Sequence, residues 1–381
     1  MNTIKSKLPN VGTTIFTAIG QLANTHNAVN LSQGFPNFDP DPKLLELVDH
    51  AFKSGYNQYA PMQGVFFLRE VISEKIESLY GHSYHPESEI IITAGATQAI
   101  FSTISTFVHS GDEVIVIKPA YDSYEPAIEL FGGVVIPIAL EGKDFKMNWE
   151  KFKSAISSKT KMVIINTPHN PTGTIWSESD MQQLQEILKD TNIILLSDEV
   201  YEHIVFDGKQ HESVAKYPDL ASRSVICSSF GKTFHATGWK MGYCAAPKEL
   251  MSEFQKVHQF NVFSVNHAIQ IALAEYLNEP EHYHDLNNFY QNKRDYFLNA
   301  IKDSRFKMTP SKGTYFQLLD YSSITDERDT DFAERLIKEY KLASIPVSVF
   351  CGEEYNQRFL RFCFAKTNDV LDQAAEILHK I

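Results

Sequence analysis

The fold of this chain is set by a stretch that reads Ser224-Val225-Ile226-Cys227-Ser228-Ser229-Phe230-Gly231-Lys232-Thr233 and continues to Lys240. Its first four residues are typical of a short buried strand. The loop that follows is rich in glycine, hydroxyl side chains and lysine. A lysine between glycine and threonine just after a strand indicates a functional site, because such sites concentrate on loops held by rigid elements.

Three kinds of site use a loop of this composition. A phosphate loop of the Gly-x-x-x-x-Gly-Lys-Thr kind needs a glycine five positions before Gly231, where Ile226 stands. An acyl-transfer site with Ser229 and Lys232 needs Ser-Asp-Asn and Lys-Thr-Gly companions, which the chain lacks. In the third, Lys232 forms a Schiff base with a carbonyl cofactor whose phosphate is held by Ser229 and Lys240. From this stretch alone, a purely structural loop explains the sequence equally well.

Six more strand-like runs lie outside this stretch, at 89–93, 113–117, 134–138, 162–166, 193–197 and 242–246. They are short, rich in β-branched residues and without polar alternation, which is typical of strands buried on both faces. Helical stretches such as 178–189 separate several of them. The pattern predicts an α/β fold whose large domain holds a mostly parallel, seven-stranded sheet covered by helices on both sides. Ligands bind such sheets at the carboxyl ends of the strands.

The pattern changes after residue 248. Long helices are expected at 249–277 and 281–303. Strands at 314–319, 343–345 and 359–364 then alternate with helices at 330–340 and 368–380. This predicts a smaller α+β domain. We therefore expect an N-terminal arm with part of the small domain at 1–40, a large cofactor-binding domain at 41–277 and a C-terminal small domain at 278–381.

Composition narrows the classes of partner. The 381 residues are 43% hydrophobic and carry a net charge of −12, which argues against nucleic acid as a partner. The first ten residues lack an apolar region, and no apolar run nears 18 residues, so neither a signal peptide nor a membrane span is expected. The four cysteines have no Cys-x-x-Cys spacing and no metal motif is present, which predicts reduced thiols in a cytoplasmic protein without a metal.

Polar residues follow the predicted strands. Asn170 stands between two prolines, as suits a fixed hydrogen-bond donor, although a structural turn would look the same. Asp198 ends a buried strand, where a carboxylate is costly unless a cation such as a protonated pyridine nitrogen pairs with it. Tyr121 places an aromatic ring at the same edge. Arg361 lies inside an apolar strand and needs an anion, either a bound carboxylate or a structural ion-pair partner.

Two further turns complete the pattern. Gly95-Ala96-Thr97 follows the strand at 89–93, and small residues there leave backbone N–H groups free to face an anion. The run Ser32-Gln33-Gly34-Phe35-Pro36 marks a loop with a fixed path, although a plain surface turn would have a similar composition.

Taken together, these motifs resemble the class I/II aminotransferases, which use pyridoxal phosphate and have the aspartate-aminotransferase (type I) fold. The resemblance runs from about residue 12 to the C-terminus, with the motifs in the family's order. The details are most similar to the branch of kynurenine aminotransferase, glutamine transaminase K and bacterial methionine aminotransferase. The motifs that carry the resemblance are Ser32–Pro36, Asn57-Gln58-Tyr59, Gly95-Ala96-Thr97, Asn170-Pro171-Thr172-Gly173, Asp198–His203, Ser229-x-x-Lys232, Thr237–Lys240 and Arg361–Phe364.

The resemblance implies a role for each matching residue. Lys232 would hold pyridoxal phosphate as a Schiff base and then move the proton between the substrate Cα and the cofactor. Asp198 would keep the pyridine nitrogen protonated. Asn170 and Tyr201 would hydrogen-bond the phenolic oxygen, and Tyr121 would stack on the ring.

It also implies how the phosphate is held. The backbone N–H groups of Ala96 and Thr97 would bind it together with Ser229 and Lys240. Many relatives carry arginine where Lys240 stands, and lysine keeps the charge but loses the bidentate fork. Tyr59 would reach the phosphate of a neighbouring subunit, which implies a homodimer.

The substrate contacts follow in the same way. Arg361, with Asn170, would bind the substrate α-carboxylate while the Gly34 loop closes over it, and Phe16 would line the side-chain pocket. The sequence has no arginine between Arg223 and Arg294 to bind a second carboxylate. We therefore expect transfer of the amino group from a neutral amino acid (methionine, glutamine, aromatic or kynurenine-like) to a 2-oxo acid. The alternative on the same scaffold is β-elimination of cysteine S-conjugates.

Overall fold

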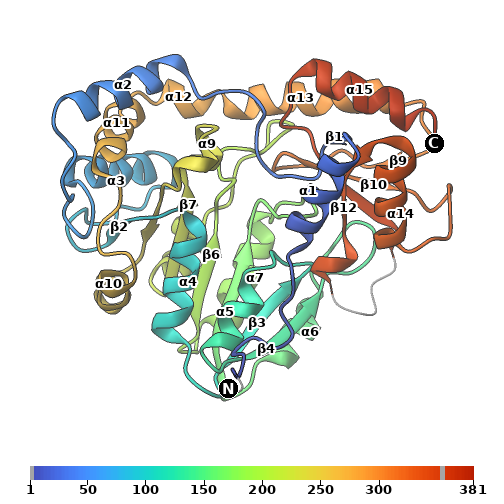
Figure 1. Ribbon diagram of the computed structural model, residues 1–381. Helices are drawn as coiled ribbons and strands as arrows, with labels where there is room; N and C mark the ends of the chain where they lie inside the picture. Colours follow the sequence, from blue (N-terminus) through green and yellow to red (C-terminus); the bar gives the residue numbers. More distant parts are fainter. Residues whose placement is uncertain (1–3, 352–356) are drawn as a thin grey trace.

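A seven-stranded sheet forms the centre of the computed structural model, which describes residues 4–351 and 357–381. Its strand order is β2-β8-β7-β6-β5-β3-β4 (Figure 1). The strands are β2 (Ile90–Thr93), β3 (Glu113–Lys118), β4 (Val134–Ala139), β5 (Thr160–Asn166), β6 (Ile194–Asp198), β7 (Ser224–Ser229) and β8 (Gly242–Ala245). Only β8 is antiparallel to its neighbours β2 and β7, while the other pairs are parallel. The predicted α/β fold with a mostly parallel sheet is confirmed.

Helices bury both faces of this sheet. Successive residues of β3 show this, because Val114 and Val116 belong to one hydrophobic cluster and Ile115 and Ile117 to another. The first cluster includes side chains of α4 (Ala96–Phe107), α5 (Tyr124–Leu130) and α10 (Lys248–Asn261). The second includes side chains of α3 (Phe66–Tyr80), α6 (Trp149–Ala155) and α7 (Glu178–Leu188). Each fully buried aliphatic side chain stabilises the fold by about 1.5–3 kcal/mol.

Strand β4 departs from the prediction that every run is buried on both faces. Val134 is 47% exposed, and only Ile138 of the strand is fully buried. β4 pairs only with β3 at one edge of the sheet, but edge position alone is not the reason, because β2 at the other edge is buried along its whole length. A run of β-branched residues does not distinguish an edge strand from a central one.

Three predicted helices are interrupted. The expected helix at 249–277 is two helices, α10 and α11 (His267–Leu277), separated by a turn in which Phe263 has φ +66°. The expected helix at 281–303 is α12 (Glu281–His284) and α13 (Leu286–Ile301). The expected helix at 330–340 is α14 (Asp329–Arg335) followed by a π-helical turn (Leu336–Tyr340). The other helices are α1 (Ile15–Thr25), α2 (Pro42–Lys53), α8 (Pro218–Ala221), α9 (Phe230–Thr233) and α15 (Asn368–Leu378).

The C-terminal elements build a second, antiparallel sheet with the order β12-β13-β10-β9. Its strands are β9 (Lys307–Met308), β10 (Phe316–Asp320), β12 (Ile345–Pro346) and β13 (Phe359–Cys363). The start of the chain joins this region, because β1 (Val29–Asn30) pairs in parallel with β11 (Leu342–Ala343). Helix α1 packs on β11 and β12, as Figure 1 shows in dark blue against orange and red. The exact domain limits at residues 40 and 277 remain predictions.

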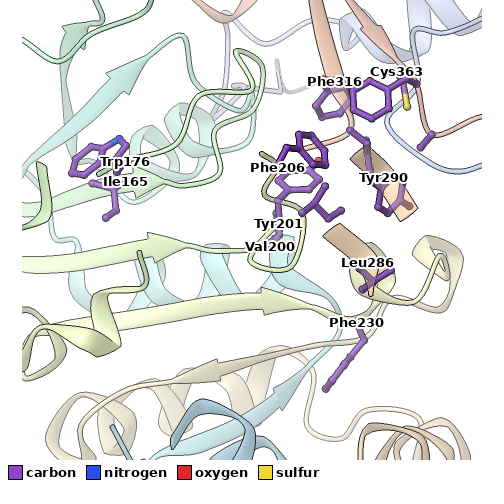
Figure 2. Packing of buried hydrophobic residues seen from close by; sticks show 14 of the residues in the cluster. Ile165, Trp176, Val200, Tyr201, Phe206, Phe230, Leu286, Tyr290, Phe316 and Cys363 are labelled. Carbon is purple, nitrogen blue, oxygen red and sulfur yellow. The ribbon is translucent and has the colours of Figure 1, made fainter. Parts of the chain in front are cut away.

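One hydrophobic cluster continues from the central sheet into the C-terminal sheet. Figure 2 shows Tyr201, from the loop after β6, close to Phe316 of β10 and Cys363 of β13. Tyr290 of α13 belongs to the same cluster. The carboxyl ends of β5 to β7 and the C-terminal strands therefore share a packed boundary.

Candidate active site

A cavity of about 250 Å³ opens at this boundary, where the parallel strands end. It brings together every predicted site residue except Tyr59, although they come from distant parts of the chain. The predicted residues that line it are Phe16, Gly34, Ala96, Thr97, Tyr121, Asn170, Asp198, Tyr201, Ser229, Lys232, Lys240 and Arg361.

Lys232 is presented by α9, which begins directly after β7. The Ser229 hydroxyl caps this helix by accepting a hydrogen bond from the Lys232 N–H at 3.3 Å. The side-chain Nζ lies 2.9 Å from the Gly34 carbonyl oxygen and 2.8 Å from the Tyr315 hydroxyl. Burial, with a smaller contribution from the nearby Arg361 charge, lowers the pKa of the Lys232 ammonium to about 8. At pH 7 about a tenth of the Lys232 side chains are then neutral amines, a far larger fraction than at the ordinary lysine pKa of 10.5.

Asp198 ends β6 and is only 4% exposed. Its partners among the described residues are the Tyr124 hydroxyl at 2.5 Å and the Val200 amide at 3.3 Å, and neither is positively charged. Burial raises the pKa of the Asp198 carboxyl to about 6. A carboxyl group that is buried against neutral donors stabilises a cation placed beside it, such as a protonated ring nitrogen.

Arg361 lies on β13 and is 1% exposed. Its described partners are neutral, namely the Asn170 Oδ1 at 2.7 Å and the Ser32 carbonyl oxygen at 3.0 Å, and its Nε has none. Burial lowers the pKa of the guanidinium to about 10. The guanidinium also lies 4.0 Å from the centre of the Phe316 ring. The geometry favours a bound carboxylate over a structural ion pair, because the described residues place neutral acceptors and a ring against the charge.

An anion cradle lies at the start of α4. Gly95 precedes the helix with φ +77°, so the first amides of the helix, on Ala96 and Thr97, lack intrahelical acceptors. The ammonium of Lys240 lies close by, because a Cβ built on Gly95 would come within 3.5 Å of Lys240 Nζ. The Ser229 side chain lines the same end of the cavity. Backbone amides, a hydroxyl and a cation form a donor set that fits a phosphate group.

The Asn170 backbone amide donates to Asn166 Oδ1 at 2.8 Å, which fixes the loop after β5. Tyr201 is buried, and its ring meets that of Tyr315 edge to face at 5.2 Å between centroids. Burial raises the pKa of the Tyr201 hydroxyl well above its usual range, so this group remains a hydrogen-bond donor at neutral pH. These two residues can hold a polar ring substituent in place.

Three other predicted residues shape the walls. The Tyr121 hydroxyl lies 3.5 Å from Thr97 Oγ1, which places this ring beside the anion cradle. Phe16 of α1 lies under the Arg361 guanidinium at 5.4 Å from its ring centre. Gly34 approaches so closely that a Cβ there would lie 2.7 Å from Phe316 Cζ. The loop around Gly34 is therefore part of the cavity wall.

Tyr59 does not line the cavity of its own chain. It is 81% exposed and lies edge to face against Phe263 at 5.4 Å. Phe260, near the end of α10, is 86% exposed. These aromatic side chains face outward in the single chain.

Several lining residues were not found by sequence reasoning. Asn166 donates from Nδ2 to the Asp198 carbonyl oxygen at 2.9 Å, and the rule that ligands bind at strand ends would have found it as the last residue of β5. Tyr124 and Tyr315 reach the site through tertiary packing, and no local signal marks them. Phe316 forms an apolar wall of the cavity next to Arg361.

Within residues 4–351 and 357–381, no group of three or more His, Cys, Asp or Glu side chains is arranged to hold a metal ion. Over the same residues, no helix combines the length and apolar character needed to cross a bilayer.

Comparison with known sequences gives matches along almost the whole chain. A family model described as aminotransferase class I and II matches residues 26–378. Methionine aminotransferase of Escherichia coli (strain K12) is 48% identical over 378 residues, which cover 99% of this chain and 98% of that protein. Kynurenine–oxoglutarate transaminase of Dictyostelium discoideum is 33% identical over 411 residues, covering 97% and 94% of the two chains.

Solved structures show the same likeness. The structure of an Escherichia coli protein with a methionine aminotransferase function has a TM-score of 0.97 at 48% identity and covers 100% of both chains. Aspartate aminotransferase of Thermus thermophilus with maleate has a TM-score of 0.90 at 28% identity, again over 100% of both chains. The similarity therefore includes every element that lines the cavity.

Proposed function

The chain belongs to the class I and II aminotransferases, and we propose that it transfers the amino group of a neutral L-amino acid to a 2-oxo acid with Lys232 as its reactive amine. The family depends on pyridoxal phosphate, which is the cofactor of this enzyme. When bound, this group supplies an electron-accepting ring for the bonds at the substrate Cα. The observation that carries the assignment is the partly buried Lys232 side chain, which lines the same cavity as Asp198 and Arg361.

Two groups of side chains and backbone amides in the cavity support an assignment of where the phosphate and the ring nitrogen of the cofactor would bind. The Ala96 and Thr97 amides, Ser229 and Lys240 would hold the phosphate, because together they supply N–H and O–H donors and one cation. Asp198 would hold the ring nitrogen in its protonated form, and its uncharged hydrogen-bond partners support this role.

The ring itself would be held from the side and from one face. Asn170 and Tyr201 would donate hydrogen bonds to the phenolic oxygen. Tyr121, which lines the cavity next to Thr97, would cover the ring face. The ring is then fixed relative to the Lys232 amine, and such orientation lowers the entropic part of the barrier.

The substrate carboxylate would bind Arg361. Its guanidinium is already fixed by Asn170 and the Ser32 carbonyl and has an unpartnered Nε, so a carboxylate gains charge-assisted hydrogen bonds at little ordering cost. The Gly34 loop would exclude water from this end, because Gly34 lies against Phe316. Water exclusion strengthens the Arg361–carboxylate attraction.

A neutral side chain suits the remaining space. Phe16 and Phe316 form apolar walls beside Arg361, and the sequence offers no arginine between Arg223 and Arg294 to neutralise a second carboxylate. The relatives named for methionine and for kynurenine support the same class of amino donor. No observation in the structure favours β-elimination over transamination.

The test uses a panel of amino donors with one 2-oxo acid. Purified enzyme loaded with pyridoxal phosphate should convert methionine, glutamine, phenylalanine and kynurenine faster than aspartate. The Lys232→Ala variant should lose both turnover and the visible absorbance of the lysine-bound cofactor, while Lys216→Ala, on a half-exposed lysine outside the cavity, should keep both. A faster rate with aspartate would refute the substrate class. Pyruvate and ammonia released from a cysteine S-conjugate, without transamination, would refute the reaction type.

We also propose that two copies form a cytoplasmic homodimer in which Tyr59 contributes to the partner's phosphate site. Its exposed ring beside Phe263, with the exposed Phe260, forms an aromatic surface of the kind enriched in interfaces. Analytical ultracentrifugation should give a dimer. The Tyr59→Phe variant should bind pyridoxal phosphate more weakly and should still be a dimer. A monomer with full activity would refute this proposal.

A further inference from the structure

Tyr315 connects the two parts of the site that meet at Lys232. It stands immediately before β10 and is 0% exposed. Its hydroxyl oxygen lies 2.8 Å from Lys232 Nζ and 2.6 Å from the Gly34 carbonyl oxygen. Lys232 Nζ also lies 2.9 Å from the same carbonyl oxygen. The three polar atoms therefore form a closed triangle.

The direction of each hydrogen bond follows from the chemistry of the groups. The Gly34 carbonyl oxygen only accepts, so the Tyr315 O–H donates to it, and the Tyr315 oxygen then accepts from Lys232 Nζ. Lys232 Nζ donates to both oxygens. A neutral amine has two N–H bonds and one lone pair, so both N–H bonds are occupied and the lone pair stays free. The described residues supply no third partner to Nζ, and Lys232 lines the cavity.

The Tyr315 hydroxyl is held in place by rigid neighbours. The ring centroid of Tyr315 lies 5.2 Å from that of Tyr201, 5.6 Å from that of Tyr290 and 5.0 Å from that of Phe316. Figure 2 shows Tyr201, Tyr290 and Phe316 gathered in one buried cluster. The Tyr315 carbonyl oxygen accepts a hydrogen bond from the Phe364 amide at 3.0 Å. The hydroxyl therefore has little freedom to follow a moving lysine.

The third corner of the triangle is fixed as well. The loop around Gly34 is tied to the C-terminal region by Lys366, whose Nζ donates to the Phe35 carbonyl oxygen at 2.7 Å. Arg361 donates to the Ser32 carbonyl oxygen at 3.0 Å. The Gly34 carbonyl thus stands between two anchored residues.

We propose that Tyr315 is a positioning residue that holds the Lys232 amine with its lone pair directed away from both oxygen partners and available to the substrate Cα proton. The proposal rests on the function proposed for Lys232. Nζ takes the Cα proton to become an ammonium, and the C–H electron pair would pass to the electron-accepting ring that the bound cofactor supplies. Nζ then gives the same proton to a carbon of the cofactor and becomes a neutral amine again. The Tyr315 proton remains on its own oxygen throughout, so Tyr315 acts through Lys232 and not as an acid or base.

The test is Tyr315→Phe, which removes one oxygen and keeps the ring. Loss of one hydrogen bond to the amine should lower kcat about tenfold. KM for methionine should stay within about twofold, because Tyr315 makes no hydrogen bond to Arg361 among the described residues and the Gly34 loop keeps its anchors at Ser32 and Phe35. The deuterium isotope effect with Cα-deuterated methionine should rise, because proton transfer becomes slower relative to the other steps.

A second readout needs no turnover. In the apoprotein, reductive methylation of Lys232 against pH, followed by peptide mass spectrometry, should show its midpoint about one pH unit lower in Tyr315→Phe. The sign follows because the lost oxygen was an acceptor that stabilised the ammonium form. Lys293, whose pKa is also lowered by burial but which lies outside the cavity, is the internal reference in the same digest.

Tyr290→Phe is the matched control, because the Tyr290 hydroxyl is buried in the same aromatic cluster and has no hydrogen-bond partner within residues 4–351 and 357–381. It should leave kcat, the isotope effect and the Lys232 labelling unchanged. The proposal is overturned if Tyr315→Phe matches Tyr290→Phe in all three, or if it raises KM alone. Failure of the proposed function would appear elsewhere, as turnover that survives Lys232→Ala.

Discussion

Removing the Tyr124 hydroxyl tests the role of the Asp198 carboxyl directly. This hydroxyl donates to Asp198 Oδ2 and opposes the effect of burial, which raises the pKa of the carboxyl to about 6. A hydrogen bond to a charged group contributes roughly 1.5–3 kcal/mol, which corresponds to about one to two pKa units. In Tyr124→Phe, the pKa of Asp198 should therefore rise to roughly 7 to 8.

The consequence is weaker cofactor binding at neutral pH. A protonated ring nitrogen needs an ionised Asp198, so affinity falls as pH drops through the pKa of this carboxyl. The probe is 4-deoxypyridoxine phosphate, which lacks the carbonyl group and so does not react with Lys232. Fluorescence titration of the apoproteins between pH 5.5 and 8.5 gives the affinity for the probe at each pH. The fall of this affinity towards low pH (the acid limb) should occur about one to two pH units higher in Tyr124→Phe than in the unmodified protein.

Titrations of the probe itself are common to both proteins and cancel in the comparison. Tyr84→Phe is the control, because the Tyr84 hydroxyl is also buried but finds no hydrogen-bond partner in the described part of the chain. Its acid limb should coincide with that of the unmodified protein. Coinciding limbs for Tyr124→Phe, or a shift to lower pH, would show that Asp198 does not hold the ring nitrogen in the way described.

Three other perturbations have signs that follow from the structure. Asp198→Asn should stabilise the apoprotein by up to about 3 kcal/mol above pH 6, because the pKa of the buried carboxyl, about 6, exceeds the ordinary 3.8. This gain in unfolding free energy should fade as the pH falls from 6 towards 4. Urea unfolding at pH 8 and pH 5 measures the gain, and equal gains at both values would contradict the prediction. Gly34→Ala should raise KM for the amino acid several-fold with a smaller effect on kcat, because the new Cβ would lie 2.7 Å from Phe316 Cζ and overpacking costs about 1–3 kcal/mol. Lys75→Met should cost about 3–5 kcal/mol in unfolding free energy, because it leaves Glu202, whose side chain is 3% exposed, without its cation. The double variant Lys75→Met with Glu202→Gln should recover part of this loss. If it recovers none, the burial of an unpaired charge is not the cause.

The sequence was most informative at the ends of the strands. Asp198 and Asn170 follow β-branched runs, and the topology of a parallel sheet then brings them to one edge, where the structure places them in one cavity. Asn166 obeys the same rule and was missed because it was counted as part of its strand. Arg361 stood out because an isolated cation in an apolar strand needs a partner.

Other features depend on packing between distant segments. Tyr124 and Tyr315 reach Asp198 and Lys232 across 74 and 83 positions of sequence, and nothing in their neighbourhoods marks them. The break between α10 and α11 contains neither glycine nor proline, so the sequence pattern does not reveal that the helix is interrupted there. The two edge strands of the sheet differ, since β4 is partly exposed and β2 is buried, and strand composition does not encode this difference.

The pairing of β1 with β11 has a consequence for biosynthesis. The Leu31 amide donates to the Ala343 carbonyl, and the Leu31 carbonyl accepts from the Cys363 amide, so partners of the Gly34 loop leave the ribosome more than 300 residues after the loop itself. Contacts of such sequence separation close late. The strands that carry Asp198 and Ser229, and helix α9 with Lys232, are complete once β8 has been translated. A nascent chain therefore acquires the half that holds the cofactor before the half that holds the substrate, and transamination waits for the last strand to emerge.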